Sequence, residues 1–287
     1  MSDSQTIARL SDIPAIPADI DAAPAPRRGP FRHRGRLISL ATILALVALW
    51  WGAARLQLVL PLFLPSPEAV LAKFFRVWSE GYVDATLLQH LLASLGRVFG
   101  ALAGALVVGV PVGLAIGLSP VARGMLDPLL EFIRPIPPLA YLPLVVIWVG
   151  IGEASKTLVI GIAMLAPIAI STAAGVRATA RERVNAARAL GATPGQVVRH
   201  VVLPSALPSI LTGVRIALGA GWSTVVAAEL IGARAGLGFM IQSASQYLVT
   251  DIVVMGIIVI AVVAFILESG IRWLERRLVP WAGQVSS

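Results

Sequence analysis

The sequence has no cysteine, which excludes a disulfide framework, an iron–sulfur site and thiolate chemistry from this chain. It is also poor in charge: Asp, Glu, Lys and Arg make up 13% of its 287 residues, whereas an average soluble domain has about a quarter. Histidine occurs only at positions 33, 90 and 200, and lysine only at positions 73 and 156. A metal centre or a nucleotide-binding lysine therefore has very few positions available.

Apolar residues are abundant instead. They make up 57% of the chain, and many lie in runs of about 20, the length that a helix needs to cross the hydrocarbon core of a bilayer. Such long runs indicate helices, in which every backbone hydrogen bond is made within the segment. The sequence therefore predicts an all-α, polytopic protein embedded in a lipid bilayer.

The formal net charge of +8 first suggests nucleic acid as a partner. The arginines, however, lie in the N-terminal tail and in loops between the apolar runs. In those places Lys and Arg set the orientation of a membrane protein. We therefore expect no nucleic-acid partner.

The apolar runs and the breaks between them predict five parts along the chain. These are a disordered basic cytoplasmic tail at 1–36, a first transmembrane helix at 37–57, a periplasmic segment with an amphipathic helix at 58–93, a core at 94–277 with a polar cytoplasmic loop at 177–205, and a C-terminal tail at 278–287. The periplasmic helix is expected at about 68–78, where apolar residues recur at helical spacing.

Five further spans are expected in the core, which makes six in all. They cover about 97–118, 136–151, 157–176, 207–231 and 252–271. The span at 136–151 carries three prolines and should be kinked at its start, after a short connection at 119–135. Two sets of glycines four residues apart, at 96, 100 and 104 and at 109, 113 and 117, predict close packing of the helix at 97–118.

The distribution of arginine predicts the topology. The loop at 177–199 holds five arginines and a single acid, Glu182, while the short loops on the other side hold few charges. Because Lys and Arg favour cytoplasmic loops, this loop and both termini are expected on the cytoplasmic side.

Within that loop the sequence predicts two short helices. The first covers Arg181–Leu190 and ends at Gly191, since the position after a helix often takes a left-handed conformation that favours glycine. Thr193 caps the second helix, which has a proline in its first turn. The pair Leu203-Pro204 is expected to stop the second helix before the next span. An exposed helix pair with an alanine face suits docking into a groove on another protein.

The spacing A-A-x3-G-x9-[IV]-x-L-P in this loop resembles the signature loop of the membrane subunits of binding-protein-dependent ABC importers. The residues that carry the likeness are Asn185, Ala186, Ala187, Gly191, Leu203 and Pro204. The resemblance implies a type I importer permease fold, in which this loop is a coupling helix seated in a cleft of a cytoplasmic ATPase. The family usually has Glu at the first position, so Asn185 leaves open whether one polar contact is kept.

The same resemblance implies an assembly in the bacterial inner membrane. Two copies of the permease, a homodimer, would form one pathway, with two cytoplasmic ATPase subunits below and a periplasmic substrate-binding protein docking above. ATP and Mg²⁺ would be bound by the ATPase, and no cofactor is expected in this chain.

Further segments resemble one branch of the family, the permeases for taurine, other sulfonates, nitrate and bicarbonate. The segments that carry this likeness include 61–65, 117–120, 134–143, 221–224, 227–230 and 276–281. The resemblance implies import of taurine or a related alkanesulfonate. Nitrate or bicarbonate import is the alternative.

Two other classes of protein are alternatives to this interpretation: an enzyme and an ion-coupled secondary transporter. An enzyme is not expected, because no catalytic pair and no metal-ligand cluster falls within the spans, and the phosphate-loop pattern at 150–157 has Ser155 in place of its second glycine. An ion-coupled secondary transporter needs ionisable groups near the middle of the membrane. The candidates Arg97, Arg215, Glu229 and Glu268 lie near span ends, which makes this alternative the weaker one.

Four residues near the end of the fifth span are candidates for the transport pathway. Trp222, Ser223 and Thr224 could line it, although the sequence does not show which way they face. Glu229 is either an end group that pairs with a basic neighbour such as Arg234, or a gate or helix-orienting residue. Both roles stay open. A gate or helix-orienting role is favoured over direct contact with the substrate, because an unpaired carboxylate would repel an anion.

Overall fold

The structure, a computed structural model, describes residues 31–279, with side chains from residue 38 onward. Most of the predicted disordered tail at 1–36 and of the C-terminal tail at 278–287 lies outside these residues. The described part of the N-terminal tail, 31–36, belongs to a helix, so the predicted disorder is wrong there. The chain divides at Gly52 into two units. The first described element, α2 (Phe31–Arg55), is long and apolar enough to cross a membrane over Ile38–Arg55. This matches the first predicted span.

The regular secondary-structure elements in the described part of the second unit are all helices. Its elements, in chain order, are α3 (Pro67–Ser79), α4 (Leu87–Leu118), α5 (Pro120–Ile133), α6 (Pro138–Val149), α7 (Glu153–Arg177), α8 (Arg181–Ala189), α9 (Pro194–Val197), a π-helix (Val198–Val202), α10 (Leu203–Glu229), α11 (Leu237–Gln246) and α12 (Thr250–Leu278). Within the described residues β-structure is limited to one isolated bridge, between Tyr82 and Ala85. The all-α prediction is confirmed.

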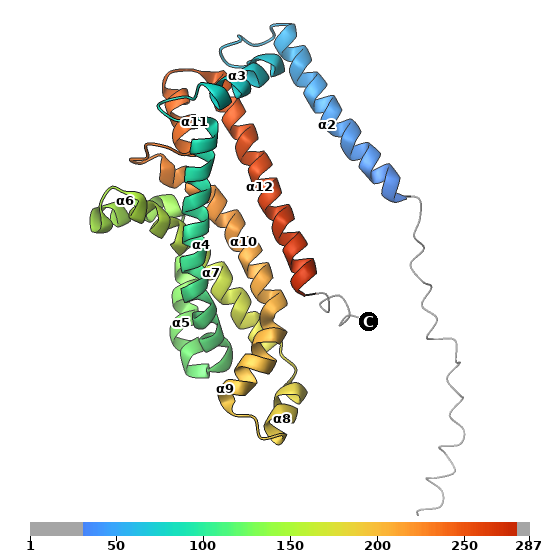
Figure 1. The fold of residues 1–287 in the computed structure, drawn as a ribbon, viewed down its shortest axis with the longest axis vertical. Coiled ribbons are helices and arrows are strands. Elements are labelled where there is room, and N and C mark those ends of the chain that lie inside the picture. The colour runs from blue at the N-terminus through green and yellow to red at the C-terminus, as the bar shows by residue number, and fades with distance from the viewer. Residues whose placement is uncertain (1–30, 280–287) are drawn as a thin grey trace, which may run out of the picture. The chain divides into compact units, whose positions relative to one another are not determined.

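The core of this unit is formed by α7, which packs along both α4 and α10 (Figure 1). Glycine allows the close approach of α4 and α7. A Cβ atom on Gly117 would come within 2.5 Å of Val176 Cβ, and one on Gly113 would collide with Ala169 and Thr172. The close packing predicted for the glycines at 109, 113 and 117 is therefore confirmed. The glycines at 96, 100 and 104 have no such close contact, since a Cβ atom on Gly96 would meet nothing within 4 Å.

Five helices are long and apolar enough to span a membrane, and a bent pair adds a sixth if it is counted as one span. The pair is α5 and α6, whose axes differ by 104°. The single kinked span predicted at 136–151 is wrong, because α6 has 12 residues and reaches only about 18 Å at 1.5 Å per residue. The connection predicted at 119–135 is also helical: it forms α5, capped by Ser119.

The segment before α4 contains the predicted amphipathic helix. α3 begins after Ser66, whose side chain accepts a hydrogen bond from the backbone N–H of Ala69. Val70 and Val77 are buried. An ion pair of 3.1 Å between Lys73 and Asp251 joins α3 to α12.

The helix that contains Leu203 and Pro204 does not stop there. A π-helical turn at Val198–Val202 leads directly into α10, and the N–H of Leu203 donates to the carbonyl of Val198, five residues earlier. Pro204 has no N–H to donate and would clash in a regular helix interior; the wider turn before it accommodates that break. The predicted stop at Leu203-Pro204 is therefore wrong, and residues 194–229 form one long helical path.

Candidate functional site

The loop between α7 and α10, here called the coupling segment (residues 181–204), is built from local signals. α8 ends in a Schellman motif: the N–H of Ala192 donates to the carbonyl of Ala187, and the N–H of Gly191 donates to the carbonyl of Arg188. Gly191 has φ +83°, a conformation that favours glycine. The predicted role of Gly191 as the residue that ends the first helix is confirmed.

The second short helix of the coupling segment is capped as expected. The hydroxyl of Thr193 accepts the N–H of Gln196, and the side chain of Gln196 accepts the N–H of Thr193. This reciprocal pair, a capping box, satisfies two backbone N–H groups at the start of α9. Gln196 was not singled out from the sequence, although it lies three residues after the cap, where the pattern requires it.

The coupling segment has an inner and an outer face. Val184, Ala187 and Ala192 pack on an apolar cluster that also includes Leu203. The buried members of this cluster are Val176, Val197, Val202, Ala206 and Ile210. The segment is therefore fixed to the end of α7 and the start of α10.

The outer face holds most of the predicted contact residues. Asn185, Ala186, Gly191 and Pro204 are exposed, and Leu190 is 89% exposed. Of the six residues predicted from the pattern, Ala187 and Leu203 instead face the cluster beneath. Leu190 is a single exposed apolar side chain, which by itself does not define a contact surface.

The predicted pathway residues on α10 point in different directions. Trp222 is buried and donates from Nε1 to the carbonyl of Ile260 on α12, at 3.2 Å. Thr224 is buried and donates to the carbonyl of Ala220. Ser223 is exposed and borders two hollows of about 380 and 330 Å³. Trp222 thus packs α10 against α12, while Ser223 has the most open position of the three.

Glu229 lies at the centre of a buried polar network at the other end of α10. Its side chain is 0% exposed. Oε1 accepts from Ser94 Oγ at 2.6 Å and from Arg97 Nη1 at 2.7 Å, and Oε2 accepts the N–H of Gly238 at 2.7 Å. The carboxylate is therefore fully paired, as a buried charge must be.

The network also caps α11. The N–H of Leu237 donates to Ser94 Oγ at 2.9 Å, next to the bond from Gly238 to Glu229. These are N–H groups of the first turn of a helix, which have no partner within the helix, and a carboxylate there also faces the positive end of the helix dipole. Glu229 and Ser94 thus fix the start of α11 against α4 and α10.

His90 supports the same turn. Its Nδ1 accepts the N–H of Gly236 at 3.1 Å, so Nε2 carries the proton and donates to the carbonyl of Tyr82 at 2.9 Å. Gly236 has φ +142°, and a Cβ atom there would collide with the Glu229 carboxylate. The turn requires glycine because the backbone passes directly over the buried acid.

Arg97 extends the network to α7. Nε donates to Glu153 Oε2 at 2.6 Å and Nη2 donates to Glu153 Oε1 at 2.9 Å, a two-bond fork. Lys156 donates to Glu153 Oε1 at 3.1 Å and to the carbonyl of Gly232 at 3.0 Å. The ion pairs of Arg97 therefore join α4, α7 and α10 at one end of the bundle.

The sequence did not predict this network. Proximity in the sequence points to Arg234 as the basic neighbour of Glu229, but the partner in the structure is Arg97. The spacing of Ser94 and Arg97, three residues apart in an apolar helix, places both on one face and was the available signal. Among the described residues no group of three or more His, Asp or Glu is placed to hold a metal ion.

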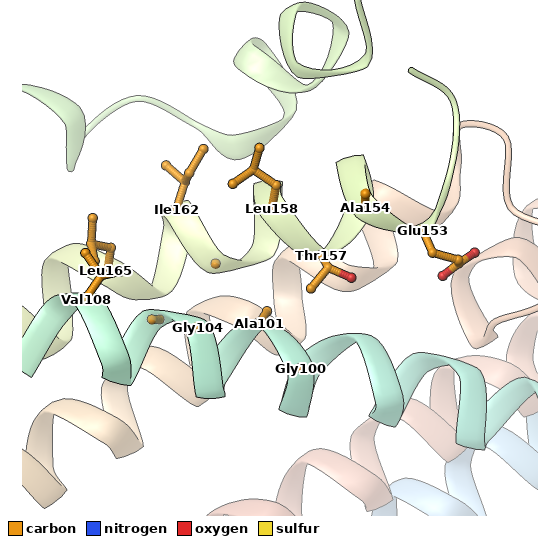
Figure 2. Close-up of a pocket in the computed structure, with 12 residues that line it drawn as sticks. Gly100, Ala101, Gly104, Val108, Glu153, Ala154, Thr157, Leu158, Ile162 and Leu165 are labelled. Carbon is orange, nitrogen blue, oxygen red and sulfur yellow. The ribbon is translucent and has the colours of Figure 1, made fainter. Parts of the chain in front are cut away.

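A hollow of about 670 Å³ lies between α4 and α7, beside the network. Figure 2 shows Glu153 at one end of it and Leu165 and Val108 at the other, with Gly100 and Gly104 along the α4 side. A Cβ atom on Gly104 would meet nothing within 4 Å, and one on Gly100 would touch only Thr157. The glycines at 100 and 104 therefore border open space; the close contact predicted for them is absent.

Comparison with known proteins gives consistent results. Residues 105–280 match the family described as binding-protein-dependent transport system inner membrane component. The taurine transport system permease protein TauC of Escherichia coli (strain K12) is 57% identical over 86% of this chain and 90% of its own length. SsuC of the same strain, whose name refers to the transport of aliphatic sulfonates, is 39% identical over 82% of this chain and 88% of its own length.

Solved structures show the same fold. The chain superposes on an inward-facing conformation of the MetNI methionine ABC transporter with a TM-score of 0.60, at 22% identity, over 67% of this chain and 95% of the other. At this identity the comparison concerns the fold alone. It confirms the helical architecture predicted for the core.

Proposed function

Because the chain belongs to the family of binding-protein-dependent transport system inner membrane components, we propose that it is the permease subunit of an ATP-driven importer for taurine or a related alkanesulfonate. The observation that carries the substrate is the 57% identity to a taurine permease, against 39% to a relative named for aliphatic sulfonates. The chain is a transport subunit, and hydrolysis of ATP belongs to its partner.

The proposed assembly contains two copies of this chain, two cytoplasmic ATPase subunits and a periplasmic substrate-binding protein. ATP and Mg²⁺ are bound by the ATPase subunits. Each ATPase contacts the outer face of one coupling segment, where Asn185, Ala186 and Leu190 are exposed. The five arginines at 177–199 support a cytoplasmic position for this segment, and with it cytoplasmic termini in the inner membrane.

The structure suggests how a push on the coupling segment reaches the other end of the bundle. The segment packs on the end of α7 and the start of α10 through one apolar cluster, so both helices move with it. Their opposite ends, about 36 Å away along α7 at 1.5 Å per residue, meet in the network of Glu153, Arg97 and Glu229. A rigid α7–α10 pair thus transmits the ATPase movement to the periplasmic end, where access changes.

The test is uptake into proteoliposomes that contain the chain with its ATPase and its binding protein. We expect uptake of radiolabelled taurine that requires ATP and is reduced by unlabelled alkanesulfonates. Competition by bicarbonate or nitrate and not by sulfonates would assign the chain to another small anion. Uptake by the chain alone, driven by a proton or sodium gradient, would instead show an ion-coupled carrier.

A further inference from the structure

The carboxylate of Glu153 is held in the structure as a bound anion would be. It accepts two bonds from the fork of Arg97 and a third from Lys156. The side chains of Arg97 and Lys156 are only 6% and 4% exposed, while that of Glu153 is 65% exposed. The two cationic side chains are therefore buried, whereas the carboxylate that pairs with them is largely exposed to solvent.

We propose that Arg97 and Lys156 form a transient binding site for the sulfonate group of the substrate, and that Glu153 occupies this site when substrate is absent. The inference rests on the proposed function, because it takes its ligand from the proposed importer. It goes beyond that function by naming a substrate-contacting site in this chain.

The charges of the network favour exchange of one anion for another. Arg97 and Lys156 carry two positive charges, and buried Glu229 neutralises one of them. If Glu153 leaves, one positive charge remains uncompensated in a largely buried place, which is strongly unfavourable. A sulfonate group restores the balance at Arg97 and Lys156, whereas a group without negative charge does not. Taurine is a zwitterion, so its ammonium group needs a separate acidic partner.

The donor geometry suits a sulfonate. Arg97 Nε and Nη2 form a planar fork, and Lys156 Nζ adds a third donor that now shares Oε1 of Glu153 with Nη2. A sulfonate has three oxygens, so each donor would have its own acceptor. The displaced Glu153 carboxylate would then be free to pair with the ammonium group of an amino-sulfonate such as taurine.

The surroundings of Glu153 allow this exchange. Glu153 is the first residue of α7 and follows a short turn that contains Gly150 and Gly152. Gly150 has φ +89°, and a Cβ atom added there would meet nothing within 4 Å. The backbone before Glu153 is therefore free of close packing on that side. Glu153 also lies at one end of the hollow between α4 and α7 (Figure 2). The other residues that line this hollow are apolar, apart from Thr157. The acid that covers Arg97 and Lys156 therefore borders open space.

The test uses the complex of this chain with its ATPase in nanodiscs, without the binding protein, which would bind substrate itself. Dissociation constants for radiolabelled taurine and for ethanesulfonate are measured by scintillation proximity and competition. Glu153→Gln removes the competing carboxylate, so we expect ethanesulfonate to bind at least about tenfold tighter than in the unaltered complex. Taurine should gain less, because it also loses the carboxylate that pairs with its ammonium group. Adding Lys156→Met to Glu153→Gln should weaken ethanesulfonate binding again by about tenfold, since one donor and one charge are lost.

Two controls keep the result clear. Glu80→Gln removes the acid of an exposed Arg76–Glu80 pair and should leave binding unchanged. If Glu153→Gln does not assemble, Glu153→Asp withdraws the carboxylate by one carbon and should still tighten sulfonate binding severalfold. Ethylammonium should not compete in any variant.

Equal sulfonate affinity in the unaltered, Glu153→Gln and Glu153→Asp complexes would overturn the site, and the Arg97–Glu153 pair would then act only as a structural link. Sulfate or bicarbonate binding more tightly than sulfonates in Glu153→Gln would also overturn it. Uptake by the full transporter, measured in parallel, reports separately on the proposed function. Intact taurine uptake with unchanged affinities refutes the site alone, while absent sulfonate uptake refutes the importer assignment.

Discussion

Arg97 Nη1 lies 2.7 Å from Glu229 Oε1, although 132 residues separate the two in the chain. The same guanidinium holds Glu153, so one arginine joins three helices. Because both Arg97 and Glu229 are buried, neither charge has water as an alternative partner. This pair therefore fixes the end of the bundle that faces away from the coupling segment.

Removing the acid of this pair should destabilise the protein. Glu229→Ala leaves part of the Arg97 charge without a partner and also removes one of the two side chains that cap α11. We expect a loss of about 3 kcal/mol, which is typical for one missing partner of a buried ion pair. The measurement is thermal unfolding of the purified permease–ATPase complex. Glu80→Ala, which breaks an exposed ion pair, should change the midpoint little; similar midpoints for both variants would contradict the assigned role.

Gly236→Ala should also destabilise the protein strongly. The added Cβ atom collides with the Glu229 carboxylate, and φ +142° is strained for any side chain. Gly270→Ala is the matched control, since a Cβ atom there meets nothing within 4 Å in the helix α12, where alanine is favoured by about 1 kcal/mol. The thermal midpoint should fall for the first variant and stay or rise for the second. A normal midpoint for Gly236→Ala would show that the turn is not held as described.

The sequence predicted those parts of the site that depend on interactions between residues close together in the chain. Gly191 and Thr193 act on neighbours within a few residues, through a helix end and a helix cap. The helix end and the cap can be read without knowing which helices lie side by side. The helical spacing of glycines is a weaker signal, because it predicted close packing correctly at 113 and 117 but not at 100 and 104.

The parts that the sequence missed depend on distant segments. Arg234 is close to Glu229 in the chain, but the fold brings Arg97 to the acid instead. The bend of 104° between α5 and α6 cannot be read from an apolar run that contains prolines, because a kink and a full break have the same signal. The helix continues through Pro204 because a π-helical turn precedes it, and no residue pattern in the sequence predicts such a turn.

Changing Gly191 should separate ATP hydrolysis from transport. Gly191→Val places a β-branched residue at φ +83°, which costs about 1–3 kcal/mol and should disrupt the end of α8. A Cβ atom added there would meet nothing within 4 Å, so the substitution disturbs no tertiary contact and membrane insertion should be unaffected. We expect ATP turnover to continue while taurine uptake falls, both measured in the same proteoliposomes.

Gly124→Val on α5 is the matched control for that variant. A Cβ atom at Gly124 also meets nothing within 4 Å, and its φ lies outside the left-handed region. Uptake should stay near the unaltered level in this control. Full uptake by Gly191→Val would argue against a coupling role for the segment.

The most direct test of the central claim concerns the side of the membrane on which the coupling segment lies. The chain has no cysteine, so Leu190→Cys introduces a single reactive group at a position that is 89% exposed. We predict that a membrane-impermeant maleimide labels this cysteine in inverted vesicles and not in right-side-out vesicles, and that bound ATPase protects it. Labelling from the outer side would contradict the account.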